Sequence, residues 1–366
     1  MAKKTNQKIK VLVWLSGWVD SAVAAYLLQK EWYEVTAGFM KNYVSETGNC
    51  TTYDDATEAI KVAKFLWIEI LSFDLQKEYN EKIINYIYEG YKKWITPNPD
   101  VLCNSLIKFD VFLQKALGMG FDYIATGHYA QIKKIGKIYK LFRWIDHNKD
   151  QSYFLSGLNQ FQLSKSLFPL WNIEKPEVRN IAKKIPNAWG QIWLPNAERK
   201  DSQGLCFVGN VPIRTFLEQK LPKKEWLTID ETGKKLWMHQ GAWFFTIGQR
   251  QGLNLPPDRY VTKIDVKINI VTVGPRGSEF LSQKEINLSD RHRIGKKYDL
   301  PLEVGAKIRY RQIEPAPAKL VVSWKYKAEN TKKITILFEE KQWAIAPGQV
   351  VVGYLADECI GSGIIN

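Results

Sequence analysis

The sequence predicts an α/β protein in three parts: a parallel-sheet domain, a small mixed domain and a C-terminal antiparallel β-barrel. From residue 9 to about 130, short apolar strands alternate with helical segments, which is typical of a parallel sheet with helices on both faces. Residues 212–280 combine a turn with strand-like runs. Beyond Ile286 the side chains alternate as in β-strands, which predicts a small barrel.

The first domain, expected over residues 1–211, should alternate strand and helix. Strands are predicted over residues 11–15, 34–39, 68–73 and 123–126, and helices over 21–30, 54–65, 76–91 and 107–117. A helical region with proline breaks follows, with helices over residues 159–166 and 176–184. Ligands of such sheets bind beyond the carboxyl ends of the strands. Ser16, Met40 and Gly127 each follow a strand, so we expect them to converge on one edge.

The remaining elements fall into a central domain, expected over residues 212–281, and a barrel, expected over 282–366. In the central domain, residues 230–233 read as a turn and residues 261–275 as a pair of strands. In the barrel, strands are predicted over residues 307–312, 319–324, 333–338 and 350–355. Arg309, Tyr310 and Gln349 are expected to lie on barrel strands.

The turn after the first strand is built for phosphate. Its sequence is Leu15-Ser16-Gly17-Trp18-Val19-Asp20-Ser21, and a helix follows at once, so backbone N–H groups and a helix N-terminus face an anion. Ser16, Asp20 and Ser21 add side-chain donors and a candidate magnesium ligand. Trp18 is unexpected, because close approach of a phosphate and a left-handed φ at this position would both favour glycine.

The four cysteines are isolated from one another and only four histidines are present, which argues against a structural zinc site. A disulfide framework is not expected in a reducing compartment. Cys103 follows Asn98-Pro99-Asp100, where two prolines fix the backbone near a helix N-terminus that favours a thiolate. An ordinary N-cap turn is the alternative. Cys206 follows a flexible Asp-Ser-Gln-Gly turn, and a small buried residue is the alternative there. Cys50 and Cys359 are interpreted as inert thiols.

Together these motifs resemble those of the bacterial tRNA-specific 2-thiouridylases, a family of the ATP-pyrophosphatase group. The match covers nearly the whole chain in the family's order, and the two cysteine motifs make it specific. It is carried by the phosphate loop and by residues 39–42, 96–104, 125–129, 149–155, 201–207, 246–250, 309–311 and 347–349.

The resemblance implies an adenine nucleotide hydrolase-like fold and ATP-dependent 2-thiolation of the wobble uridine of tRNA. ATP, with Mg²⁺, would adenylate the uridine 2-oxygen and so make it a good leaving group. Cys206 would carry a persulfide and Cys103 would attack it, which frees the sulfur and leaves a Cys103–Cys206 disulfide. Asp100 would act as acid or base beside the nucleobase.

The resemblance also implies two sets of binding residues. The ATP set is Trp14, Leu15, Ser16, Gly17, Trp18, Val19, Asp20, Ser21, Met40 and Gly127. The tRNA set is Asn98, Pro99, Asp100, His128, Lys149, Asp150, Gln151, Arg309, Tyr310 and Gln349. Without the resemblance, His128 would be a core histidine, residues 149–151 a solvated turn, and the barrel residues plain surface.

The net charge of +14 and the pI near 9.3 indicate a polyanionic partner, although a lysine-rich proteome would give the same balance. The basic residues are spread along the chain, which suits the folded anticodon arm of a tRNA. The other expected partner is a persulfide donor, such as a cysteine desulfurase or a sulfur-relay protein. No apolar run of ~18 residues and no signal-peptide pattern occur, so we expect a cytoplasmic protein that does not engage the membrane.

Many of the 14 tryptophans occupy positions that favour glycine. Trp32 and Trp67 each end a helix before a strand, where a left-handed residue is wanted. We hypothesise that the source reads UGA as glycine and that the printed tryptophans are a translation artefact; authentic tryptophans in a diverged protein are the alternative. Trp243, Trp324 and Trp343 lie in hydrophobic runs and fit as genuine tryptophans. The glycine-like set is Trp14, Trp18, Trp32, Trp67, Trp94, Trp144, Trp171, Trp193, Trp226 and Trp237.

Two competing functions remain open at the level of sequence. Another adenylating ligase or amidotransferase would use the phosphate loop without needing both cysteines. A catalytically silent RNA-binding homologue would be expected if Trp18 is authentic, because an indole inside the loop should block the β- and γ-phosphates.

Overall fold

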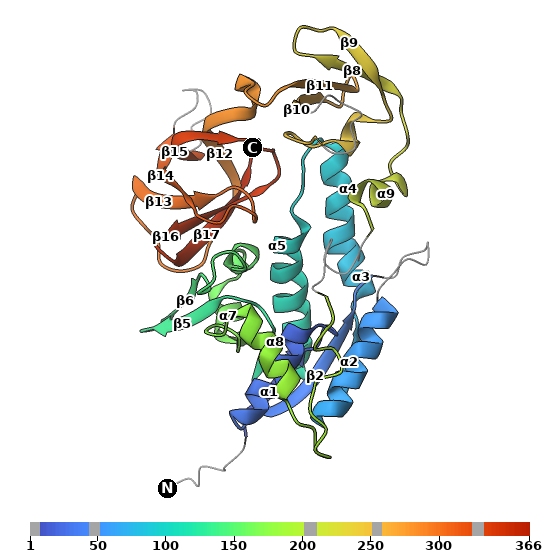
Figure 1. Cartoon of the computed structure of the whole chain (residues 1–366). Helices are drawn as coiled ribbons and strands as arrows, with labels where there is room; N and C mark the ends of the chain where they lie inside the picture. Colours follow the sequence, from blue (N-terminus) through green and yellow to red (C-terminus); the bar gives the residue numbers. More distant parts are fainter. Residues whose placement is uncertain (1–7, 44–51, 201–210, 251–257, 324–332) are drawn as a thin grey trace. The chain divides into compact units, whose positions relative to one another are not determined.

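The computed structural model describes residues 8–43, 52–200, 211–250, 258–323 and 333–366 (Figure 1). The chain forms two compact units. Unit 1 comprises residues 1–82 and 100–211, and unit 2 comprises residues 83–99 and 212–366. The segment 83–99 therefore belongs with the C-terminal half of the chain, although it is flanked on both sides by unit 1.

Unit 1 contains the predicted parallel sheet. Its strand order is β3-β2-β1-β4-β7, and every neighbouring pair is parallel. The central strand β1 is an apolar run with a fully buried middle, as expected for a strand covered on both faces. The bounds are β1 Lys10–Trp14, β2 Glu34–Lys41, β3 Ile70–Asp74, β4 Tyr123–Ala125 and β7 Ser166–Leu167.

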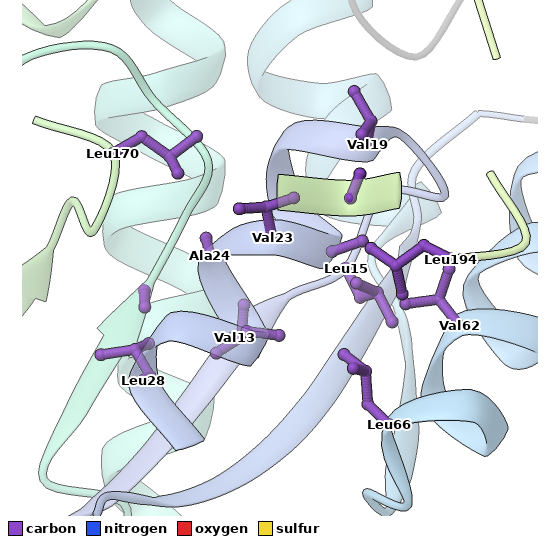
Figure 2. Close-up of a cluster of buried hydrophobic side chains, with 14 of the residues drawn as sticks. Val13, Leu15, Val19, Val23, Ala24, Leu28, Val62, Leu66, Leu170 and Leu194 are labelled. Atoms are coloured by element: carbon purple, nitrogen blue, oxygen red, sulfur yellow. The ribbon is translucent and has the colours of Figure 1, made fainter. Parts of the chain in front are cut away.

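Helices α1 (Val19–Lys30), α2 (Thr52–Leu66) and α8 (Lys175–Lys184) supply apolar side chains to the core of unit 1. Figure 2 shows this core, in which side chains of β1 and α1 meet Val62 and Leu66 of α2. Helix α1 is rich in small residues, and all its alanines are buried, so it packs closely against its neighbours. This packing fixes the start of α1 beside the carboxyl end of β1.

Two predicted helices differ from the observed ones in their bounds. The helix predicted over residues 76–91 comprises α3 (Gln76–Tyr79), a π-helical stretch (Asn80–Ile84) and α4 (Asn85–Lys92). The helix predicted to begin at residue 107 begins at residue 99. It comprises α5 (Pro99–Cys103), a π-helical stretch (Asn104–Phe112) and α6 (Leu113–Gly118). Proline is well tolerated in a first helical turn, so Pro99 starts this helix.

The rest of unit 1 includes a hairpin that the sequence pattern did not reveal. Strands β5 (Gln131–Ile135) and β6 (Ile138–Phe142) pair antiparallel, with Gly136 at a φ of 62° in the turn. A 3₁₀ helix (Ser152–Leu155) and α7 (Gln160–Ser164) follow. Asn159 and Gln162 form a capping box that starts α7.

The small mixed sheet of unit 2 has the order β10-β11-β8-β9. The turn predicted at residues 230–233 is confirmed: Gly233 has a φ of 90°, and the Asp230 carboxylate accepts hydrogen bonds from Thr232 and Lys234. Helix α4 packs here, with the Tyr88 hydroxyl donating to the Phe216 carbonyl at 2.8 Å. The bounds are α9 Ile213–Glu218, β8 Trp226–Asp230, β9 Lys235–His239, a 3₁₀ turn Ala242–Phe244, β10 Arg259–Asp265 and β11 Ile270–Pro275.

The C-terminal strands form the predicted antiparallel barrel, which is closed (Figure 1). The order is β12-β15-β14-β13-β16-β17, and β12 also pairs with β17. Apolar residues of these strands, including Val304, Ile336 and Val351, form its core. The bounds are a 3₁₀ turn Glu279–Leu281, β12 Ser282–Arg293, β13 Leu302–Lys307, β14 Ala316–Ser323, β15 Lys333–Trp343, β16 Val350–Leu355 and β17 Glu358–Ile365.

The predicted strand over residues 307–312 is wrong, because β13 ends at Lys307. The Gln312 side chain accepts a hydrogen bond from the Ile308 N–H and donates to the Ala306 carbonyl, which turns the chain back. Arg309 and Tyr310 therefore lie in a turn rather than on a strand. Gln349 also lies just outside a strand, in the turn before β16.

Four tryptophans adopt left-handed backbone conformations. Their φ angles are 66° at Trp32, 56° at Trp67, 61° at Trp94 and 97° at Trp193, and they make up half of the eight described non-glycine residues with positive φ. The left-handed conformations expected at Trp32 and Trp67 are confirmed. Trp144 differs from these four: it is buried, and its indole N–H donates to the Leu170 carbonyl at 3.0 Å.

Candidate nucleotide-binding site

The phosphate loop joins β1 to α1 and is held by its own serines. The Ser21 hydroxyl accepts from the Ser16 N–H at 3.1 Å and lies 3.0 Å from the Ser16 hydroxyl. It also lies 3.0 Å from the Trp18 carbonyl, to which it donates. Leu15 and Val19 on either side are buried, which anchors both ends of the loop. The loop therefore presents a helix N-terminus with a fixed backbone, as anion binding requires.

The expected convergence at the sheet edge is confirmed. Met40 is buried near the end of β2, beside β1. Gly127 follows β4 and lies directly against the start of α1, because a Cβ on Gly127 would come within 2.7 Å of the Ser21 nitrogen. A larger residue would push this strand end away from the loop.

The left-handed φ expected at Trp18 is wrong, because Trp18 has a φ of −99° and is the N-cap of α1. The left-handed residue is its neighbour Gly17, at 80°. The Trp18 ring stacks on the Arg199 guanidinium, with 3.9 Å from the guanidinium carbon to the ring centroid. The backbone at this position thus accepts a side chain, and only the approach of a ligand remains as a reason for glycine.

Asp20, the candidate magnesium ligand, is engaged by two other side chains. One of its carboxylate oxygens accepts from the Tyr129 hydroxyl at 2.6 Å and from the Lys175 ammonium at 2.6 Å. Lys175 is nearly buried at the first position of α8, so Asp20 holds a cation beside the phosphate loop. No group of three or more acidic, histidine or cysteine side chains in the described parts of the chain could hold a metal ion.

The carbonyl of Gly17 is tied back to the segment before residue 200. It accepts from the Asn196 amide at 2.9 Å and from Arg199 at 3.1 Å. The other arm of the Arg199 guanidinium donates to the Asp55 carboxylate at 2.6 Å. Gly17 is so close to these groups that a Cβ there would lie 2.5 Å from the Asp55 carbonyl oxygen.

Asp100 and Cys103 both lie in the five-residue helix α5, with Asp100 in its first turn. The Cys103 thiol is buried, and so is that of Cys359 in the barrel. A helix N-terminus stabilises a thiolate most within the first turn. Cys103 lies beyond that turn, at the end of α5, and so later in the helix than predicted. Cys206 lies outside the described residues, as does Cys50.

In unit 2, the segment leading to Asn98 and Pro99 is held by the turn that carries Gln349. The Thr96 N–H donates to the Pro347 carbonyl at 2.8 Å, and the Gln349 amide donates to the Thr96 carbonyl at 3.0 Å. Three of the predicted tRNA residues are therefore neighbours, and Gln349 acts on the other two through the backbone of Thr96.

A half-buried tyrosine, Tyr91, supports the same region of unit 2. Burial raises the pKa of Tyr91 to about 12, and a hydrogen bond with Thr246 partly offsets the rise. The Thr246 hydroxyl also lies 3.3 Å from that of Thr96. Thr246 begins the predicted 246–250 motif, so this motif braces the segment before Asn98.

His128 has the environment of a core histidine. Its ring lies among Trp14, Phe109 and Phe168, and its Nδ1 is 2.7 Å from the Thr126 hydroxyl. Burial, assisted by the Lys108 ammonium, lowers the pKa of His128 well below its ordinary value. The imidazole is therefore neutral near pH 7. Its contact with tRNA stays a prediction.

The three residues 149–151 differ sharply in their surroundings. Asp150 is buried, where its carboxylate accepts from the Trp144 and Ser152 N–H groups, each at 3.0 Å. The Gln151 side chain accepts from the Tyr129 N–H at 2.9 Å. Lys149 alone is exposed. Two of the three side chains thus shape the loop from within, and Lys149 projects outward.

Arg309 and Tyr310 share the turn after β13. The Arg309 guanidinium donates to the Trp343 carbonyl and lies 5.8 Å from the centroid of the Trp343 ring. Trp343 itself packs on Tyr260 and donates its indole N–H to the Arg276 carbonyl. This environment suits a genuine tryptophan.

Lys175, Asn196, Arg199 and Tyr129 are the polar residues at the loop that sequence reasoning missed as site residues. All four lie far from the loop in sequence. Tyr129 ends the 125–129 motif, and the other three belong to none of the motifs named above. One weak signal existed for Arg199, which lies two residues before the Asp201–Phe207 motif. For Lys175 the only signal was its place before the proline that starts a helix.

The sequence matches three family profiles in succession. Residues 9–210 match the tRNA methyl transferase HUP domain, residues 214–275 the tRNA methyl transferase PRC-barrel domain, and residues 283–365 the aminomethyltransferase beta-barrel domain. No helix in the described part of the chain has the length and apolar character needed to cross a membrane.

Curated relatives extend over nearly the full chain. The tRNA-specific 2-thiouridylase MnmA of Flavobacterium johnsoniae is 40% identical, over 98% of this chain and 100% of its own. The proteins of that name from Listeria welshimeri and Halalkalibacterium halodurans are also 40% identical. The first covers 99% of this chain and 95% of its own, and the second 100% and 97%.

Proposed function

The chain belongs to the tRNA-specific 2-thiouridylase family, and from this premise we propose that it catalyses ATP-dependent 2-thiolation of the wobble uridine of tRNA. The observation that carries the proposal is the loop between β1 and α1, with Gly127 closed against it at the carboxyl edge of the sheet. We propose residues 1–211 as the catalytic domain, residues 212–281 as the small central domain and residues 282–366 as a tRNA-contacting barrel.

ATP fits this edge of the sheet. The start of α1, with Ser16 and Ser21, offers donors to phosphate oxygens, and Lys175 adds positive charge beside them. Met40 and Gly127 would border the nucleoside. Mg²⁺ would be held mainly by the phosphates, because Asp20 already accepts two hydrogen bonds.

The chemistry that we propose overcomes a poor leaving group. Transfer of AMP from ATP to the uridine 2-oxygen releases pyrophosphate and makes that oxygen a leaving group. The terminal sulfur of a Cys206 persulfide then attacks C2, and AMP departs with the former 2-oxygen. The Cys103 thiolate attacks the inner sulfur, which breaks the S–S bond, leaves sulfur on C2 and forms a Cys103–Cys206 disulfide. A thiol reductant restores both cysteines.

Asp100 is proposed to move protons at the nucleobase, with Asn98 and Pro99 beside it. For tRNA binding, the net charge of +14 supports phosphate contacts, and the exposed Lys149 is suitably placed to make one. Arg309, Tyr310 and Gln349 are proposed to contact the anticodon arm, and the sulfur would come from a persulfide donor protein.

Nucleoside analysis tests the proposal. The full chain is incubated with unmodified tRNA, ATP and a small-molecule persulfide donor, and digested tRNA is examined by mass spectrometry for 2-thiouridine. We expect 2-thiouridine from the parent chain and from the control variant Cys359→Ser, which removes the buried thiol of the barrel. Cys103→Ser and Cys206→Ser should yield none. Formation of 2-thiouridine by Cys206→Ser would remove Cys206 from the mechanism. Equal ATP consumption by the parent chain and by Cys206→Ser, with no 2-thiouridine formed by either, would favour another adenylating enzyme of the same fold.

The silent RNA-binding alternative makes a different prediction for the same assay. It requires that the parent chain binds tRNA but neither binds ATP nor forms product. Comparison with Trp18→Gly separates the cases, since restored ATP binding in that variant alone would assign the defect to the indole. Trp18 has an extended backbone that glycine also adopts, so the substitution needs no change of backbone conformation.

A further inference from the structure

The Gly17 carbonyl is held by two side chains from outside the phosphate loop. Two donors from one short segment reach it, Asn196 at 2.9 Å and Arg199 at 3.1 Å. Arg199 is itself fixed on its other side by Asp55 at 2.6 Å, and Asn196 is buried. Such redundancy at a single carbonyl oxygen is more than backbone satisfaction alone requires.

The direction of this carbonyl decides the direction of the next amide. In a planar trans peptide, the carbonyl oxygen of Gly17 and the N–H of residue 18 point to opposite sides. Holding the oxygen toward Asn196 and Arg199 therefore turns the residue 18 N–H away from them. Within the described part of the chain, no group accepts a hydrogen bond from the N–H of Gly17 or of Trp18.

The segment also has anchors of its own. Arg179 of α8 donates to the Ala197 carbonyl at 3.1 Å and to the Arg199 carbonyl at 3.2 Å. The Leu194 N–H donates to the Ala182 carbonyl of the same helix at 2.9 Å. The loop is thus held from a rigid helix through two side chains, which is how preorganised anion sites avoid reorganisation on binding.

We infer that Asn196 and Arg199 are positioning residues that aim the residue 18 N–H at the polyphosphate of the nucleotide. The inference rests on the proposed ATP-dependent function. The two side chains then strengthen the binding of phosphate groups and do not affect the binding of the nucleoside. Arg199 acts through its fork geometry as well as its charge, because it must reach Gly17 and Asp55 at once.

Calorimetric titration with ATP, inorganic pyrophosphate and adenosine tests this inference. The variants are Asn196→Ala and Arg199→Lys, the second of which keeps the charge. Each should weaken binding of ATP and of pyrophosphate roughly 10-fold, the equivalent of one lost hydrogen bond, and leave adenosine unchanged. Lys200→Ala, which removes a neighbouring exposed charge, should leave all three affinities at the parent level.

Equal weakening for adenosine, or unchanged ATP affinity in both variants, would overturn the inference. Repeating Arg199→Lys in the Trp18→Gly background separates the hydrogen bond from the stacking on the indole, and the 10-fold loss should persist there. If the parent chain binds ATP and forms no 2-thiouridine, the proposed function fails while the positioning role stands. If the parent chain does not bind ATP, both fail.

Discussion

Four tryptophan side chains stand at backbone positions where a Cβ is unfavourable. Trp32 and Trp67 are 77% and 71% exposed, so packing of the indole offsets little of the strain. A non-glycine residue with a left-handed φ costs on the order of 1 kcal/mol, and more when it is bulky. This supports the hypothesis that glycine is the natural residue at these helix ends.

We therefore expect Trp32→Gly and Trp67→Gly each to raise the free energy of unfolding by about 1 kcal/mol, as measured by urea denaturation. Trp343→Gly is the matched control. Its indole packs on Tyr260 and donates a hydrogen bond, so its loss should destabilise the protein by about 2 kcal/mol or more. Destabilisation in both Trp32→Gly and Trp67→Gly would contradict the glycine hypothesis. An intact mass of the native protein that requires 14 tryptophans would also contradict it.

His128 should make the stability of the protein depend on pH. The pKa of His128 is lowered in the folded state, so the unfolded state binds its proton more readily. The stability linked to His128 is fully present above its unfolded pKa of about 6.5 and is lost as the pH falls below that value. Unfolding free energies measured from pH 7.5 to pH 5 should decline.

The variant His128→Gln should reduce this decline. The decline will not vanish in His128→Gln, because burial also lowers the pKa of His239 and acts in the same direction. An unchanged pH dependence in His128→Gln would show that the imidazole does not titrate with folding.

At the scale of elements, the loop over residues 149–151 separates a structural role from a binding role. Removing the Asp150 carboxylate leaves buried N–H groups of Trp144 and Ser152 without that acceptor, so Asp150→Ala should cost about 2–4 kcal/mol of stability. Lys149→Ala should weaken tRNA binding severalfold. Denaturation and filter binding measure the two effects. Equal tRNA affinity in Lys149→Ala would remove Lys149 from the binding surface.

The elements that sequence could predict are those with a local signal. The apolar strands β1 to β4 and the turn with Gly233 follow from periodicity and turn chemistry, and their positions are confirmed within a few residues. A helix N-terminus was expected near Asp100 and Cys103, but its continuation into the helix predicted from residue 107 was missed, because the polar Asn104 and Ser105 interrupt the apolar pattern. The turn at Arg309 was missed because residues 308–312 contain neither glycine nor proline, and the Gln312 side chain folds back on Ala306 instead.

The same distinction applies to the candidate site. Ser16, Ser21 and Gly127 could be predicted, because strand ends converge at the carboxyl edge of a parallel sheet. Lys175 and Arg199 could not, since each meets the loop only through tertiary packing of a segment more than 150 residues away. Local sequence patterns do not indicate contacts between residues so far apart in the chain.

At the scale of the whole molecule, charge should govern the affinity for tRNA. With a net charge of +14 and six or more phosphate contacts, the tRNA affinity should fall by about 10³-fold or more between 50 and 200 mM salt. Filter binding across that range measures the slope. A slope near zero would show that the basic residues serve another purpose, such as solubility. Poly-glutamate of similar length is the control for charge alone.

The assignment of residues 83–99 to unit 2 bears on how the chain is made. During synthesis, α4 leaves the ribosome early. Its Tyr88 stacks on Phe216, which is made only after residues 100–211. At about 5–20 residues per second, those 112 residues take roughly 6–20 s to synthesise. During that interval Tyr88 of α4 lacks its native partner Phe216, so we expect this part of the nascent chain to need a holding chaperone.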